Sequence, residues 1–385
     1  MKEPKIRFKG FRGEWETKNI ASVASLKAGV SIDTSQEISY QIQGYYPCYG
    51  GNGLRGYVRD YTHDGIYNII GRQGALCGNV RIVTGKFHAT EHAVVVTPIK
   101  KLNPYFLFNV LTKANINQYA TGVAQPGLSV QNVNKRLYIH IPNFDEQQSI
   151  ASYFQHLDAL IQSTTKKIES LKQVKAASLQ SMFPQEGETT PRVRFKGFEG
   201  EWEKVSLGEE TYPAGIKNYE NLPLDSYSIS NEFGFIPQNL QFENGGTMAT
   251  ADKRMYYIVS KNSFGYNPAR INVGSLGYYS GNENVIVSSL YEIFKTSDRI
   301  CDTFLLYWFK TSMFQKLIEQ YQEGGVRFYF FYDKLCMCQI FVPSYEEQCA
   351  IASYFTNLDR QITLHTQRLE KLKQIKAACL DKMFV

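Results

Sequence analysis

Two stretches of the chain have the hydrophobic spacing of long amphipathic helices. One follows Pro142 and the other follows Pro343, and neither stretch contains an internal proline or glycine. Apolar residues recur in both with a period of 3.5, as they do along a coiled-coil seam. The residues predicted to pair the helices are Ile150, Phe154, Leu157, Ile161, Ile168 and Leu171 in the first stretch, and Ile351, Phe355, Leu358, Ile362, Leu369 and Leu372 in the second. We expect two helices of about 38 residues, roughly 57 Å long.

These helices belong to an internal repeat. The matching segments are 6–16 with 193–203, 142–154 with 343–355, 171–177 with 372–378, and Met182-Phe183 with Met383-Phe384. The chain is therefore a duplication of one unit of roughly 200 residues, far longer than the period of about 20–50 residues that a solenoid has. A duplicated unit that closes on itself most simply has a pseudo-twofold axis, so we expect the two helices to pair antiparallel.

The middle of each repeat has the pattern of short strands and turns. Apolar and polar residues alternate over 67–70, 92–96 and 284–288. Asn103 and Asp302 each precede an apolar run, which is typical of a helix N-cap. The fold class is therefore predicted as α+β, with two similar domains joined by two long antiparallel helices. The expected boundaries are a first domain over 1–143, a first long helix over 144–183, a linker over 184–192, a second domain over 193–343 and a second long helix over 344–385.

Composition indicates an ordinary globular protein. Of 385 residues, 43% are hydrophobic and 20% are charged. No apolar run approaches the length of about 18 residues that a membrane span needs, and the charged first residues lack the apolar core of a signal peptide. Seven scattered cysteines favour reduced thiols over a disulfide framework, and the spacing of Cys336 and Cys338 alone does not make a zinc site. We expect a cytoplasmic protein with no membrane partner.

Three weak matches to catalytic motifs do not support the assignment of an active site. Gly51 to Gly56 matches G-x-G-x-x-G, but it lacks the following helix and the downstream acidic residue of a dinucleotide site. Tyr266 to Arg270 is faintly similar to the Asn-Pro-Pro-aromatic motif of amino-methyltransferases, but the second proline and the aromatic residue are missing. His88 and His92 lie in a strand-like pattern, which does not suit a helical metal pair. We therefore expect no active site, no metal and no cofactor in this chain.

Basic and amide side chains among glycines and tyrosines point instead to DNA. Arg, Lys, Asn and Gln read base edges in the major groove, and glycine lets backbone N–H groups approach phosphates. The candidate DNA-binding residues are Arg55, Arg59, Arg72, Gln73, Asn79 and Arg81 in the first repeat, and Lys253, Arg254, Tyr266, Asn267, Arg270, Asn272 and Arg327 in the second. The net charge of +6 is uneven, because residues 17–143 hold twelve basic and five acidic residues whereas 204–343 hold twelve basic and fourteen acidic ones. The first domain is therefore expected to bind DNA more strongly.

The order of these segments resembles the DNA-specificity subunit of type I restriction–modification systems. The resemblance rests on the repeated unit starts (Phe8 to Phe11 and Phe195 to Phe198, with Trp15 and Trp202), on the junctions that follow Pro142 and Pro343, and on the Leu-Lys-Gln-Val/Ile-Lys-Ala-Ala helix ends. Asn68 to Gly74 and Phe264 to Ile271 look like segments common in target-recognition domains of that family.

The resemblance implies a role in DNA recognition. Each target-recognition domain would read one half of a bipartite, asymmetric double-stranded DNA site, and the paired helices would fix the gap between the halves. It also implies two methyltransferase subunits and additional restriction subunits as partners. The partners, rather than this chain, would bind S-adenosylmethionine, ATP and Mg²⁺, and the subunit itself would not be an enzyme.

Two alternatives remain open from the sequence. The chain could be a stand-alone two-headed DNA-binding regulator whose helices only join the domains, and capture of methyltransferase subunits would separate this from the main interpretation. It could also be a methyltransferase that uses Asn267 and Pro268 as a degenerate motif, which an assay of cofactor binding would decide.

Overall fold

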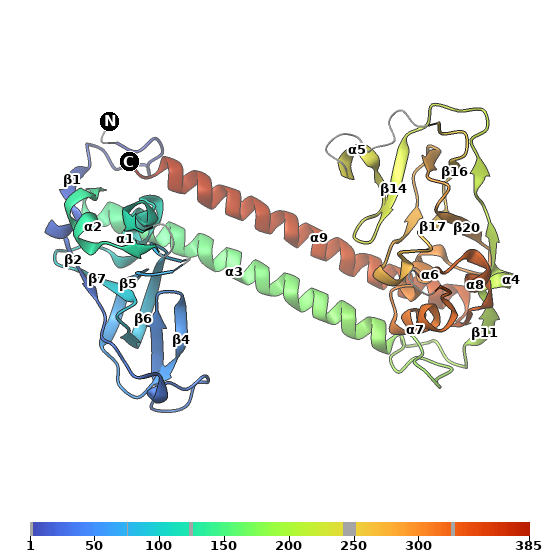
Figure 1. The fold of residues 1–385 in the computed structure, drawn as a ribbon, viewed down its shortest axis with the longest axis horizontal. Coiled ribbons are helices and arrows are strands. Elements are labelled where there is room, and N and C mark those ends of the chain that lie inside the picture. Colours follow the sequence, from blue (N-terminus) through green and yellow to red (C-terminus); the bar gives the residue numbers. More distant parts are fainter. Residues whose placement is uncertain (1–2, 75, 123–125, 242–251, 325–327) are drawn as a thin grey trace. The chain divides into compact units, whose positions relative to one another are not determined.

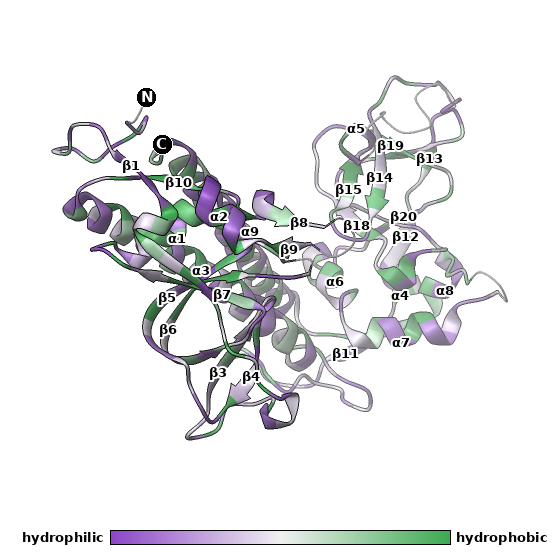
Figure 2. Cartoon of the chain, turned by 60° about the vertical axis from the view of Figure 1, so that its left-hand side comes forward, coloured by the Kyte–Doolittle hydropathy of each residue, from purple (hydrophilic) through white to green (hydrophobic). Residues whose placement is uncertain are grey.

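The computed structural model describes residues 3–74, 76–122, 126–241, 252–324 and 328–385. It divides into two compact units, the first made of Met1–Lys166 with Thr366–Val385 and the second of Lys167–His365. Each unit thus contains one α+β domain, the start of one long helix and the end of the other. Figure 2 shows hydrophobic residues in the strands and in the helices that pack on them, while the long helices alternate hydrophobic and hydrophilic residues.

The domain of the first unit is built on a six-stranded sheet with the order β2-β7-β5-β6-β3-β4. Its strands are β2 (Ala24–Ala28), β3 (Tyr46–Gly50), β4 (Gly53–Val58), β5 (His63–Gly71), β6 (Val80–Ala89) and β7 (Ala93–Pro98). All neighbours are antiparallel except β3 and β6, which are parallel. The remaining elements are β1 (Glu16–Asn19) paired with β10 (Tyr138–Ile141), β8 (Ala120–Thr121) paired with β9 (Gly127–Leu128), and the helices α1 (Pro104–Lys113) and α2 (Val130–Arg136).

The domain of the second unit has two larger sheets instead of one. The five-stranded sheet has the order β13-β16-β19-β14-β15 and the four-stranded sheet has the order β12-β20-β17-β18. The strands are β12 (Thr211–Pro213), β13 (Ile216–Lys217), β14 (Ser226–Ser230), β15 (Gly234–Pro237), β16 (Tyr257–Val259), β17 (Ser263–Tyr266), β18 (Leu276–Tyr279), β19 (Val285–Val287) and β20 (Glu292–Thr296). A separate pair joins β11 (Glu203–Ser206) to β21 (Gln339–Val342), as β1 joins β10 in the first unit.

Short helices complete the second domain. They are α4 (Leu207–Glu210), α5 (Gln238–Gln241), α6 (Asp302–Trp308), α7 (Ser312–Tyr321) and α8 (Tyr332–Met337). The α+β class predicted from the sequence is confirmed, and so are the strands expected at 67–70, 92–96 and 284–288. Asn103 caps α1 as expected, accepting hydrogen bonds from the backbone N–H groups of Tyr105 and Phe106. The expectation that Asp302 is an N-cap is wrong, because Cys301 holds that position and the Asp302 carboxylate accepts hydrogen bonds from Tyr278 and Thr296.

The two long helices, α3 (Phe144–Ser181) and α9 (Tyr345–Lys382), are unbroken (Figure 1). In the first unit the start of α3 lies beside the end of α9, where the Tyr153 hydroxyl is 3.6 Å from the Cys379 sulfur and Asp158 accepts a hydrogen bond from Lys376. Residue numbers rise along one helix as they fall along the other, so the pairing is antiparallel, as predicted.

The second unit repeats the same contacts with the helices exchanged. Tyr354, at the start of α9, is 2.9 Å from the Ser178 hydroxyl, and Asp359 accepts a hydrogen bond from Lys175. Tyr354 and Asp359 occupy the positions of Tyr153 and Asp158 in the repeat. The duplication visible in the sequence is therefore a duplication of specific helix–helix contacts.

The residues predicted to pair the helices have two different environments. Those near the helix starts, Ile150 and Phe154 in α3 and Ile351, Phe355 and Leu358 in α9, are buried in the cores of the domains that precede them. Leu157, Ile168 and Leu171 are also buried, and Leu171 joins the core of the second domain. Ile161, Ile362, Leu369 and Leu372 are half-buried. The helix starts are therefore parts of a globular core as well as of a helix pair.

Each domain core is completed by the end of the long helix that began in the other repeat. In the first unit the Phe384 ring packs against Trp15, Phe106 and Phe154, with centroids 5.6 to 6.3 Å apart. In the second unit Phe183 packs against Trp202, Phe304 and Phe355 in the same way, at 5.3 to 6.5 Å. Phe183 and Phe384, the second residues of the repeated Met-Phe pairs, thus each complete an aromatic cluster in a domain core. We call each of these two phenylalanines an aromatic plug.

A buried ion pair ties the start of each long helix to the start of its own repeat. The Arg7 guanidinium donates two 2.7 Å hydrogen bonds to the fully buried carboxylate of Glu146. Arg194 binds Glu347 with the same two bonds and the same distances. Glu146 and Glu347 each lie in the first turn of a long helix, and the ion pair joins that turn to the start of the repeat.

The glutamine that follows each of these glutamates anchors the junction. Gln147 donates to the carbonyl of Pro142 and accepts from the backbone N–H of Asn103. Gln348 makes the corresponding bonds to Pro343 and Cys301. The repeated Glu-Gln pair therefore fixes the angle at which each domain meets its helix.

The aromatic plug predicts a large loss of stability on truncation. Phe384→Ala removes a side chain that is 5% exposed, and we expect the free energy of unfolding to fall by about 3–5 kcal/mol, since large-to-small changes leave a cavity. The more exposed Ile375→Ala, in α9, is the matched control and should change the free energy of unfolding by less than about 1 kcal/mol. Urea unfolding followed by circular dichroism measures both, and equal effects would contradict the closure of the core by this residue.

The buried ion pair predicts a second loss. Arg7→Ala leaves the Glu146 carboxylate buried without its guanidinium, and removing one partner of such a pair costs about 3–5 kcal/mol. Arg12→Ala, at an exposed position five residues away, serves as the control. A drop in urea midpoint that is no larger for Arg7→Ala than for Arg12→Ala would show that the pair does not hold the junction.

Candidate nucleic-acid interface

A polar hollow of about 550 Å³ lies in the first domain where the β3–β4 turn meets the loop after β5. It is lined by Gly51, Asn52, Arg55, Gln73, Gly74, His92, Pro126 and Gly127. The glycines permit close approach of the backbones here. A Cβ on Gly53 would lie 2.9 Å from the Arg81 guanidinium carbon, and its φ of +109° favours glycine in any case. The site is therefore shaped by a hairpin turn and not by a phosphate-binding loop before a helix.

Among the predicted arginines of the first domain, Arg55 lines this hollow, and Arg72 and Arg81 lie next to residues that line it. Arg55 forms a 2.7 Å ion pair with Glu37, Arg72 donates to the carbonyl of Glu91, and Arg81 donates to the carbonyl of Asn52. Gln73 is exposed at the rim. The structure thus brings Arg55, Arg72, Gln73 and Arg81 together from three different segments.

Two predicted residues of the first domain have other surroundings. Asn79 is exposed, and its carbonyl accepts a hydrogen bond from Gly71 that closes the loop between β5 and β6. Arg59 follows β4 at the end of the hairpin away from the hollow, and it donates to the Tyr45 hydroxyl at 3.2 Å. Arg59 therefore does not belong to the hollow.

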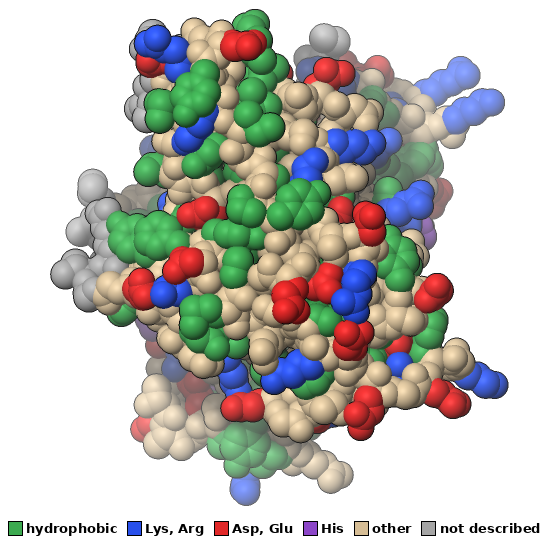
Figure 3. All heavy atoms as spheres, turned by 90° about the vertical axis from the view of Figure 1, so that its right-hand side faces the viewer, with side chains coloured by type: hydrophobic (Ala, Val, Ile, Leu, Met, Phe, Trp, Pro, Cys, Tyr) green, Lys and Arg blue, Asp and Glu red, His purple; other side chains and the backbone are tan. Residues whose placement is uncertain are grey.

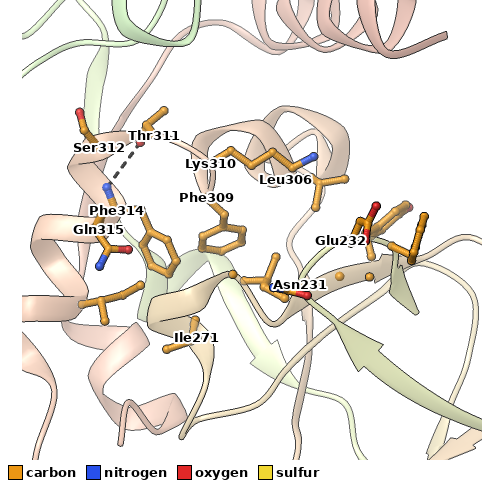
Figure 4. Close-up of a pocket in the computed structure, with 17 residues that line it drawn as sticks. Asn231, Glu232, Ile271, Leu306, Phe309, Lys310, Thr311, Ser312, Phe314 and Gln315 are labelled. Atoms are coloured by element: carbon orange, nitrogen blue, oxygen red, sulfur yellow. Dashed lines mark hydrogen bonds between the residues drawn. The ribbon is translucent and has the colours of Figure 1, made fainter. Parts of the chain in front are cut away.

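A second hollow of about 550 Å³ lies in the second domain, between the β14–β15 turn and the α6–α7 junction. Asn231, Glu232, Ile271, Gly274, Lys310, Ser312 and Gln315 are among its lining residues. Figure 4 shows Phe309 and Phe314 between Gln315 on one side and Asn231 on the other, and the Thr311 side chain caps α7 at the backbone N–H of Phe314. None of these polar residues lies in a sequence motif, so sequence reasoning missed them.

The predicted loop of the second domain borders this hollow. Arg270 and Asn272 are exposed on either side of Ile271, which lines it. The side-chain Oδ1 of Asn267 accepts a hydrogen bond from the backbone N–H of Ala269, and this bond shapes the turn. Tyr266 is fully buried between aromatic rings, and burial holds its pKa well above the usual range. Its side chain therefore lies in the core and not on a DNA-facing surface.

The remaining predicted residues of the second domain lie elsewhere. Arg254 is exposed and forms a forked ion pair with Asp252, whose pKa its hydrogen bonds lower to about 2. Lys253 is half-buried beside it. Arg327 lies outside the described residues. On the face of the second unit drawn in Figure 3, acidic and basic side chains are intermixed, so the positive charge there is local.

The weak catalytic motifs have structural explanations. Gly51 and Gly53 form a β-hairpin turn, and Asn267 with Pro268 forms a turn whose proline carbonyl accepts a hydrogen bond from Phe330. All seven cysteines are free thiols. Within the described ranges, no group of three or more His, Cys, Asp or Glu side chains could hold a metal ion. In the same part of the chain, no helix is both long enough and apolar enough to cross a membrane.

The family model for the type I restriction modification DNA specificity domain matches the chain twice, over residues 12–173 and 233–374. The chain belongs to this family. Each match covers most of one domain and much of the long helix that follows it, so the family unit coincides with the internal repeat. The role of a DNA-specificity domain is recognition and not catalysis, and the family resemblance inferred from the sequence is confirmed.

Individual relatives agree with this assignment. The type I restriction enzyme EcoprrI specificity subunit of Escherichia coli is 42% identical over 161 residues, covering 42% of this chain and 40% of that protein. The chain thus matches less than half the length of this relative. A putative type I restriction enzyme MjaX specificity subunit of Methanocaldococcus jannaschii is 25% identical over 333 residues, covering 79% of this chain and 73% of the relative.

A solved structure has the same fold. The crystal structure of a type I restriction–modification system S subunit from M. genitalium superposes with a TM-score of 0.67 at 16% identity, covering 100% of this chain and 99% of the other. At this identity the likeness concerns the fold alone. It includes both α+β domains and both long helices, because the whole chain is covered.

Proposed function

We propose that this chain recognises a bipartite, asymmetric sequence in double-stranded DNA, each domain reading one half of it. The observation that carries the proposal is the double match of the DNA-specificity family, once in each repeat. The two domains differ in their sheets and in the residues around their hollows, so the two half-sites should differ in sequence.

The exposed side chains around the hollows suit base reading. Asn and Gln pair with adenine and Arg pairs with guanine in the major groove. The first domain offers Asn52, Arg55 and Gln73 around one hollow, and the second offers Arg270 and Asn272 beside the other. The Glu37 carboxylate holds the Arg55 guanidinium in place, and bound DNA would either take the place of Glu37 or contact the guanidinium beside it.

The long helices set the gap between the half-sites. Each contains 38 residues without a break, and one helical turn of DNA separates equivalent faces by roughly 34–36 Å. Helices of fixed length would therefore admit only certain spacings between the two reading domains.

The reaction itself belongs to partner subunits. In this proposal two methyltransferase subunits bring S-adenosylmethionine, and restriction subunits bring ATP and Mg²⁺, to the site that this chain selects in the cytoplasm. The names of the relatives, which are specificity subunits of type I restriction enzymes, support a subunit of a larger enzyme.

Single arginine changes test the reading surfaces. Arg72→Ala and Arg270→Ala should each weaken binding to the specific duplex by about 1–3 kcal/mol if the side chain contacts guanine, since a bidentate pair has that value. Arg59→Ala, which removes an arginine outside the hollow, is the control. Binding isotherms of the assembled complex at fixed salt measure the change, and unchanged affinity in both variants would reject these contacts.

A domain exchange tests independent reading. Replacing residues 17–140 with the corresponding segment of another family member should change one half-site and leave the other half-site and the spacer as they were. Methylation mapping of a host that carries the exchanged chain with its partner subunits gives the answer directly. Simultaneous change of both half-sites would mean that the two domains do not read separately.

A further inference from the structure

The two units carry matched hollows at the starts of their long helices, apart from the reading surfaces. The first, about 440 Å³, lies between the segment 7–18, the segment 100–102 and the start of α3. The second, about 460 Å³, lies between 194–203, 299–300 and the start of α9. The repeat aligns Arg7 with Arg194, Pro142 with Pro343 and Gln147 with Gln348, so the two hollows are copies of one feature.

The charge of the hollow is reversed between the copies. Apart from the Arg7–Glu146 and Arg194–Glu347 pairs, the first is lined by four basic and two acidic side chains, and the second by one basic and four acidic ones. These are Arg12, Lys18, Lys100, Lys101, Glu14 and Glu16 in the first, and Arg299, Glu199, Glu201, Glu203 and Glu210 in the second. The exchange of Arg12 for Glu199 falls within an otherwise closely matching segment.

The basic hollow is separate from the reading surface of its own domain. His92, which lines the reading hollow, precedes β7, and Lys100 to Leu102, which line the basic hollow, follow it. The six residues of β7 span roughly 20 Å between them. Base reading therefore does not account for the positive charge here.

The walls of the basic hollow combine charge with apolar surface. Leu102, Ile141, Pro142 and the half-buried Phe144 form the apolar part, and the Lys101 ammonium lies 4.3 Å from the centre of the Phe144 ring. Such a surface suits a peptide whose acidic side chains meet the lysines and arginine while an apolar side chain fills the floor. A duplex presents phosphates but no apolar side chain for this floor.

We propose that the basic hollow of the first unit docks an acidic peptide segment of a partner subunit, and that the acidic hollow of the second unit excludes the same segment. This inference rests on the proposed function, because it assigns a docking position to the partners of a specificity subunit. Two copies of one partner would then engage this duplicated chain unequally, since juxtaposing like charges opposes association.

Peptide binding to the full chain tests the proposal. The probe is a fluorescein-labelled dodecapeptide with four Glu-Glu-Phe units, and its anisotropy is followed at low and at high salt. We expect one peptide per chain, affinity that falls as salt rises, and at least tenfold weaker binding in the Arg12→Glu, Lys101→Glu double variant. Glu199→Arg is the matched control in the second hollow and should not weaken binding. Both changed positions of the double variant are exposed, so the fold should be retained.

Several results would overturn the docking site. The site would be rejected if the peptide did not bind saturably, if two equivalent peptides bound per chain, or if the double variant bound the peptide as tightly as the unchanged chain. It would also be rejected if a DNA duplex displaced the peptide and the double variant lost affinity for the duplex as much as for the peptide. DNA binding is measured in parallel on the same chain. A chain that binds its duplex but not the peptide disproves only the docking site, whereas one that binds the peptide but no duplex disproves the proposed function.

Discussion

The structure depends on the closure of each domain core by a helix end from the other repeat. Phe384 and Phe183 each fill an aromatic cage made by a tryptophan, a domain phenylalanine and a phenylalanine of the other long helix. The start of each helix is fixed by the buried Arg–Glu pair and its end is fixed by this plug. Each long helix is therefore part of both cores, one at its start and the other at its end.

The duplicated parts of the fold could be predicted from the sequence, because they leave two kinds of signal. The 3.5-residue period and the absence of proline and glycine predicted α3 and α9, and repetition of the ends predicted two similar units. The sequence did not show the roles of individual residues in these segments. Asp302 looked like an N-cap and no local pattern marked Glu146 as an ion-pair partner, because partners distant in the sequence decide both roles. Such partners lie up to 139 residues away, beyond any local pattern.

The surroundings of the candidate DNA-binding residues were also predicted only in part, for a related reason. Arg55, Arg72 and Arg81 stood out as basic residues among glycines. Arg55 lines one hollow, and Arg72 and Arg81 lie next to its lining residues Gln73 and Asn52. Tyr266 had the same local surroundings, but every residue of β17 is buried, and the Tyr266 ring packs against Phe294 and Phe330 in the core. Asn231 lies far in the sequence from Ser312 and Gln315 of α7, and these residues line one hollow only in the fold. The duplication has preserved the framework of the two units and allowed their sheets, hollows and charges to diverge.

Methylation mapping of a host that carries the unmodified chain with its partner subunits would show whether the two domains select two different half-sites. We expect one modified motif made of two dissimilar specified sequences separated by a fixed number of unspecified base pairs. A single continuous motif, two identical half-sites or a variable spacer would contradict this expectation.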